Sequence, residues 1–171
     1  MKSASRANSF RLLIWLFPLS VMAAIFLFSA QTGAESGMLS GGLTRWLLNA
    51  ASRIFPINDP DRFAVSAGTV IRKLAHVTEF TVLYLSLLLA FKTTDPRRPA
   101  HPFRALISLL LTFIYASGDE LHQLFVPGRA CAPTDVLIDV SLPAVVTAVT
   151  VLKAVIVLNK AKTRKKHSDD K

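Results

Sequence analysis

Residues 74–91 read LAHVTEFTVLYLSLLLAF, and this run decides the fold because it is about as long as a helix that crosses a membrane. A bilayer core about 30 Å thick needs roughly 20 mainly apolar residues in a helix. Three more apolar stretches lie at residues 12–30, 103–127 and 135–158. The sequence therefore predicts an all-α integral membrane protein whose four spans pack as a four-helix bundle.

Two of these stretches need a further argument. The third is apolar without interruption only over residues 105–117, which is too short to span. It completes a span only if its helix continues through Asp119 and Glu120 toward Pro127, and we expect that continuation. The first stretch follows basic residues, as in a signal peptide, but it is longer than the apolar core of such a peptide. We expect the first stretch to be a retained span, with cleavage after residues 32–34 as the alternative.

Composition excludes several classes of protein. Of the 171 residues 51% are hydrophobic and 18% are charged, against about 25% charged in an ordinary soluble domain. A chain this apolar is not disordered, and its one cysteine, Cys131, excludes a disulfide scaffold. The net charge of +9 comes from basic residues that lie between the apolar stretches and at the two ends, as they do around membrane spans. We therefore expect no nucleic acid partner.

The distribution of Lys and Arg predicts the orientation. With the amino terminus inside, the inner segments hold thirteen of these residues and the outer segments hold six. By the positive-inside rule both termini are cytoplasmic, and the protein is a multi-pass protein of the cytoplasmic membrane. The expected organisation is a cytoplasmic segment at 1–11, a four-span membrane domain at 12–158 and a basic cytoplasmic tail at 159–171 that contacts anionic lipid.

The first outer loop contains a second helical pattern. Apolar residues recur there at i, i+3, i+4, i+7 and i+11, which draws one stripe along a helix. We expect an amphipathic helix that lies flat in the outer interface, and the alternative is a solvated loop helix packed on the spans. The residues of the stripe are Leu43, Trp46, Leu47, Ala50 and Ile54.

Capping residues and prolines predict where helices begin and bend. Asp59 followed by Pro60 is typical of an N-cap with proline at the first helical position, so the second span's helix should start well before its apolar part. Thr134 is the expected N-cap of the fourth span. Pro143 should kink that span.

Ionisable side chains gather at one depth. Each costs about 2.5–3.5 kcal/mol in hydrocarbon, so each needs a reason to be there. In the predicted orientation those of three different spans lie in the outer half of the membrane or just above it, which is what one shared polar pocket would produce. The candidate binding or network residues are His76, Glu79, Asp119, Glu120, Gln123, Arg129, Asp135 and Asp139.

Three motifs carry a family resemblance. FSAQ at 28–31, KLAHVTEF at 73–80, and DELHQLFVPGR at 119–129 followed by Asp135 resemble the VanZ-like membrane protein family, and the similarity runs over about residues 12–155. The family is named for a protein associated with resistance to the glycopeptide teicoplanin, so the resemblance implies a function at the cell envelope. The chain departs from the family pattern at 142–144, where LPA replaces an expected glycine. The resemblance assigns seven of the candidate residues to the family's site, all except Asp139.

Three functions remain open at this point. The polar residues either form an ion-paired network that fastens helix ends, or bind the head group of a membrane lipid or cell-wall lipid intermediate and so affect glycopeptide susceptibility. The third is an intramembrane enzyme that uses acid–base or metal-assisted chemistry on lipid-linked substrates. The H-E-x-x-H signature is absent and no activated nucleophile is evident, so we expect no metal, no cofactor and more readily a binding protein than an enzyme. Transport is disfavoured because Lys153 is the only ionisable residue deep in the inner half.

Overall fold

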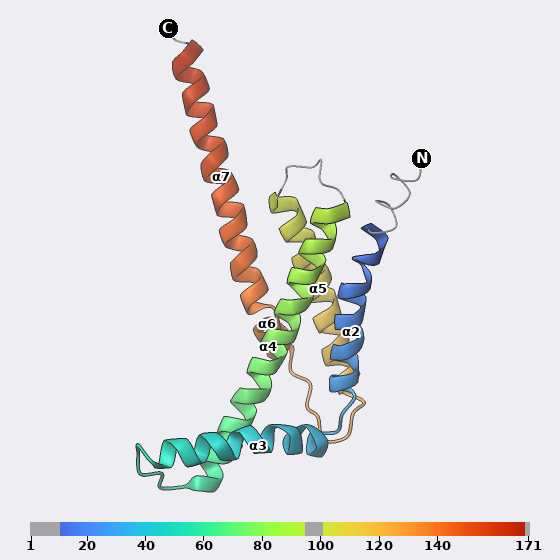
Figure 1. Ribbon diagram of the computed structural model, residues 1–171, viewed down its shortest axis with the longest axis vertical. Helices are drawn as coiled ribbons and strands as arrows, with labels where there is room; N and C mark the ends of the chain where they lie inside the picture. Colours follow the sequence, from blue (N-terminus) through green and yellow to red (C-terminus); the bar gives the residue numbers. More distant parts are fainter. Residues whose placement is uncertain (1–10, 95–100, 170–171) are drawn as a thin grey trace.

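The computed structural model describes residues 11–94 and 101–169, and within these ranges the regular structure is entirely helical. Figure 1 labels the helices, and we use the same labels. They are α2 (Leu16–Ser29), α3 (Gly33–Ser52), α4 (Pro60–Thr94), α5 (His101–Gln123), α6 (Pro133–Asp139) and α7 (Ser141–Asp169).

The long helices α2, α4, α5 and α7 run along the length of the molecule, and α3 lies across one end of them. In Figure 1, α2, α4 and α5 stand side by side, α3 crosses below them, and α7 rises beside α4 and α5 before leaning away. The end of α2, the start of α4 and the end of α5 lie at the end marked by α3. The loop that joins α5 to α6 therefore meets the α2–α3 junction.

Within residues 11–94 and 101–169, three helices are long and apolar enough to cross a membrane, namely Arg11–Ser29, Pro60–Thr94 and Ser141–Arg164. By their length and apolar composition, these helices confirm the prediction of a multi-pass membrane protein. Helix α5 is not among the three, although it does continue through Asp119 and Glu120 as expected and ends at Gln123. A membrane crossing by α5, which corresponds to the third predicted span, and the four-helix bundle remain predictions.

Helix α4 is the centre of the packing. Its residues Phe80, Leu83 and Tyr84 are fully buried, and Thr147 of α7 donates a hydrogen bond of 2.9 Å to the Tyr84 hydroxyl. Many apolar side chains on the outside, such as Leu152, stay exposed, as expected of surfaces that face lipid. The buried apolar cluster consists of Ile25, Phe80, Leu83, Leu87, Ala116, Val136 and Val140.

The predicted start of α4 is confirmed and that of the fourth span is not. The Arg62 backbone N–H donates to the Asp59 carboxylate at 2.9 Å, and the helix begins at Pro60. Thr134 is not an N-cap, because α6 begins one residue earlier at Pro133 with Ala132 in the capping position. Proline suits the first helical position, since its missing N–H has no helical partner there in any case.

Pro143 does more than kink the last span. Helix α6 ends at Asp139 and α7 begins at Ser141, with Val140 between them at φ −92° and ψ 2°. Pro143 lies four residues after Asp139. It has no N–H to donate to the Asp139 carbonyl, and in a continuous helix its ring would collide with that carbonyl. The expected single helix from Asp135 is therefore two helices.

Helix α3 exists as predicted but begins ten residues before the apolar stripe. A capping box starts it: the Thr32 hydroxyl accepts from the Glu35 N–H at 3.3 Å, and the Thr32 N–H donates to the Glu35 carboxylate at 2.8 Å. Thr44 is buried toward Gly68 of α4, whereas Trp46 of the stripe is 64% exposed. Leu47 and Ala50 of the stripe are half-buried, and Ile54 lies beyond the end of α3 at Ser52. The amphipathic character of α3 and its contact with a membrane interface therefore remain predictions.

Candidate functional site

A buried hydrogen-bonded triad joins α2 to α5. The Ser29 hydroxyl donates to the Asp119 carboxylate at 2.7 Å, and the Gln123 amide donates to the same oxygen at 3.0 Å. All three side chains are at least 94% buried. Hydrogen bonds to a charged group contribute about 1.5–3 kcal/mol, so this triad fixes the end of α2 against the end of α5.

The loop at residues 124–132 is held on the α2–α3 junction. Arg129 donates from Nε to the Gln31 carbonyl at 3.1 Å and from Nη2 to the Phe28 carbonyl at 3.4 Å. A cation at these carbonyls is favourable because they lie at the C-terminal end of α2, where the helix dipole is negative. Gly128 adopts φ +75°, and a Cβ at Gly33 would collide with the Gly128 carbonyl oxygen. Both glycines are therefore required for this contact.

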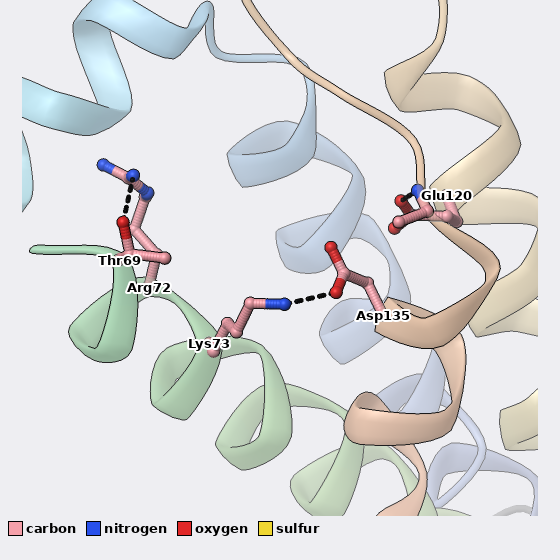
Figure 2. A network of polar contacts seen from close by, with 6 residues as sticks. Thr69, Arg72, Lys73, Glu120 and Asp135 are labelled. Atoms are coloured by element: carbon pink, nitrogen blue, oxygen red, sulfur yellow. Dashed lines mark hydrogen bonds and ion pairs between the residues drawn. The ribbon is translucent and has the colours of Figure 1, made fainter. Parts of the chain in front are cut away.

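Glu120 holds the other end of the loop. Its carboxylate accepts a hydrogen bond from the Ala132 backbone N–H at 2.8 Å and another from the Cys131 thiol. Ala132 caps α6, so Glu120 of α5 sets where α6 begins. Figure 2 shows this contact beside the loop.

An ion pair connects α6 to α4. The Lys73 ammonium and the Asp135 carboxylate point toward each other across the space between the two helices (Figure 2). Both side chains are partly exposed, and pairs of this kind contribute at most about 1 kcal/mol. The pair therefore orients α6 more than it stabilises the fold.

Two guanidinium groups lie close to each other near this ion pair. Arg72 donates to Thr69 one turn earlier on α4 at 3.4 Å (Figure 2). Burial lowers the pKa of Arg129, and the positive charge of Arg72 lowers it further. Among the described residues, neither arginine forms an ion pair with a carboxylate. Their positive charge is therefore only partly compensated.

These groups surround a cavity of about 320 Å³, which we call the polar cavity. A smaller cavity of about 180 Å³ adjoins it and shares the wall formed by Ser36, Arg72, His76 and Arg129. His76 Nδ1 is buried and has no hydrogen-bond partner among the described residues. The ionisable residues that line the polar cavity are Arg72, Lys73, His76, Glu120, Arg129, Asp135 and Asp139.

The structure brings most of the predicted residues to this region. Glu79 lines the smaller cavity rather than the polar one. Asp119 turns toward Ser29 and lines a separate, apolar crevice instead of the polar cavity. What any of these residues binds remains a prediction. Those that line the polar cavity are His76, Glu120, Gln123, Arg129, Asp135 and Asp139.

Sequence reasoning missed Arg72 and Ser29 as members of the site. Arg72 lies four residues before His76 and thus on the same helix face, a spacing that could have identified it. Ser29 lies in the FSAQ motif that carries the resemblance, but the motif does not reveal its partner Asp119, which is ninety residues away. In the part of the chain that the structure describes, no three His, Cys, Asp or Glu side chains come together as metal ligands.

A model of the VanZ/LLP1 family matches residues 14–153. The chain belongs to this family. The VanZ/LLP1 match runs from α2 into α7 and contains every residue that lines the polar cavity. No curated protein and no solved structure matches the chain.

Proposed function

We propose that this VanZ/LLP1 protein binds the phosphate-bearing head group of a membrane lipid in the polar cavity. The observation that carries the proposal is the pair Arg72 and Arg129, two guanidiniums on the wall of the polar cavity without a carboxylate partner in the described residues. Arginine presents a planar fork of donors that matches phosphate oxygens. A phosphate between the two groups would also relieve their repulsion.

The remaining charges favour a head group that carries both signs. Glu120, Asp135 and Asp139 also line the polar cavity, and carboxylates there can accept hydrogen bonds from hydroxyl or ammonium groups of a head group. With both termini cytoplasmic, as the Lys and Arg distribution predicts, the cavity opens at the outer leaflet. A cell-wall lipid intermediate would then be a natural ligand, and its binding would be the route to altered glycopeptide susceptibility.

The test compares two lipids that differ only in the phosphate, dioctanoyl phosphatidic acid and dioctanoylglycerol. We expect the purified protein to bind the first in preference to the second. Arg72→Gln should weaken the binding of phosphatidic acid about tenfold or more, because it removes a charge-assisted contact. Arg72 is a better choice for mutation than Arg129, since Arg72 donates to Thr69 on its own helix, whereas Arg129 holds the loop on α2.

Arg62→Gln is the matched control. Arg62 is an exposed arginine of the same helix and lies outside the polar cavity, so its loss should leave binding unchanged. Equal affinity for the two lipids, or equal binding by wild type and Arg72→Gln, would contradict the proposal.

One observation favours the enzymatic alternative as a second candidate. His76 lines both cavities, its Nδ1 has no hydrogen-bond partner in the described part of the chain, and an imidazole in such a place can transfer a proton. Mass spectrometry of the incubated lipids tests this: chemical change of the lipid by wild type, but not by His76→Gln, would identify a reaction. Unchanged lipid in both samples would leave binding as the function.

A further inference from the structure

A third cavity of about 370 Å³ lies between α2, α4 and α5. It shares no residue with the polar cavity or with the smaller cavity that adjoins it. Its size falls within the range of ligand sites, about 300–1,000 Å³. Most of its wall is apolar, with Met22 and Phe26 from α2, Leu83 and Leu87 from α4, and Leu111 and Ile114 from α5. We call it the apolar crevice.

The crevice is open on one side. Phe26 and Ile114 on its rim are 49% and 57% exposed, and Phe26 belongs to one of the helices that are long and apolar enough to cross a membrane. Its two sides are bridged by the Tyr115 hydroxyl of α5, which donates to the Met22 carbonyl of α2 at 2.6 Å. The bridge holds the two helices at a fixed separation without closing the space between them.

One end of the crevice is polar and the other is not. Asp119 and His122 lie at the end of α5, which is near the α2–α3 junction, whereas Leu111 lies eight residues before Asp119 and so about 12 Å away along the helix axis. His122 Nε2 is buried without a partner in the described part of the chain, and its ring packs on Phe26 with a centroid distance of 4.8 Å. A buried polar atom without a partner is costly and calls for one.

We propose that the apolar crevice binds one acyl chain of a bilayer lipid, with an ester oxygen of that lipid hydrogen-bonded to His122 Nε2. The polarity of the crevice runs in the same direction as that of the lipid, from the interfacial ester inward to hydrocarbon. The site is independent of the head-group site proposed above, since no lining residue is common to both.

Gly118 provides a direct test. It lines the crevice, and a Cβ added there meets no atom within 4 Å, so Gly118→Leu is the substitution chosen to fill the space. Gly42→Leu is the matched control, because Gly42 has the same free space but lies on α3 outside the crevice.

The protein is reconstituted in nanodiscs that contain an ester phospholipid with a diazirine on one acyl chain, irradiated, and mapped by peptide mass spectrometry. We expect stronger labelling at Met22 and Leu111 than at Leu152, an exposed residue of α7. Gly118→Leu should lower the labelling of the crevice to the level of Leu152, and Gly42→Leu should not. His122→Phe keeps an aromatic ring and removes Nε2, so it should lower the labelling of the crevice in part.

Labelling that is no stronger in the crevice than at Leu152 would overturn the proposal, since the crevice would then hold only the surrounding bilayer. Labelling that persists unchanged in Gly118→Leu would overturn it as well. If Gly118→Leu does not fold, Ile114→Trp blocks the rim instead and is read in the same way. Arg72→Gln should leave this labelling unchanged, which separates failure here from failure of the head-group proposal.

Discussion

At the scale of the residue, the chemistry of the only cysteine depends on one carboxylate. Burial raises the pKa of the Cys131 thiol, and the Glu120 carboxylate beside it raises the pKa further. The same carboxylate accepts from the Ala132 N–H. One side chain therefore both shapes the loop and keeps the thiol protonated.

This contact predicts the pH dependence of thiol labelling. The thiolate is the reactive form, so a raised pKa means that the reaction of Cys131 with a maleimide is slow at pH 7.5 and keeps rising at pH values where an ordinary cysteine has levelled off. Glu120→Gln keeps the acceptor for Ala132 and removes the charge. It should increase the labelling rate at pH 7.5 several-fold, as measured by mass spectrometry over time.

Asp61→Asn serves as the control, because Asp61 lies in the first turn of α4 and is not among the groups that act on Cys131. Identical rates for wild type and Glu120→Gln would show that the carboxylate does not act on the thiol.

At the scale of the element, two prolines decide where helices are interrupted. Pro143 separates α6 from α7 at Val140. Pro18 acts in the same way on the first span, where Ile14, four residues earlier, lies in a turn and bonds to the Phe17 N–H at 3.2 Å. In both cases the cause is the missing N–H and the ring at position i+4. The break at Val140 turns α6, and with it Asp135, toward Lys73.

Pro143→Ala should therefore join α6 and α7 and separate Asp135 from Lys73. In a Cys131→Ser background, cysteines at 73 and 135 should be cross-linked by a short bifunctional maleimide, and Pro143→Ala should reduce the yield. Pro60→Ala is the control, since Pro60 stands at the first position of α4, where a proline breaks nothing. An undiminished yield in Pro143→Ala would mean that tertiary contacts, and not the proline, place α6.

At the scale of the whole molecule, orientation relates the cavities to the two sides of the membrane. The α5–α6 loop and α3 lie at the same end, and the ends of α4 and α7 lie at the other. The polar cavity therefore opens on the side of the membrane that the α5–α6 loop faces. The Lys and Arg distribution predicts the outside.

A membrane-impermeant thiol reagent tests this orientation. Cys131, or Ala130→Cys in a Cys131→Ser background, should react in intact cells, whereas Lys162→Cys in that background should react only after permeabilisation. Ala130 is exposed, so its reaction does not depend on the burial of the thiol. The opposite pattern would place the polar cavity in the cytoplasm.

The sequence alone determined the membrane class, because an apolar run long enough to span is a local property that needs no tertiary partner. It also determined the start of α4 and the presence of α3, since capping residues and helical periodicity act within a few residues. The capping box at Thr32 and Glu35 is equally local, and it could have placed the start of α3.

Only the tertiary structure decided how the polar residues are divided among the cavities. Ser29 takes Asp119 out of the polar cavity and into the wall between α2 and α5, and Gly33 and Gly128 press the loop onto α3 so that Arg129 reaches α2. These contacts join residues about ninety or more positions apart. Each depends on how whole helices approach one another, which sequence periodicity does not specify.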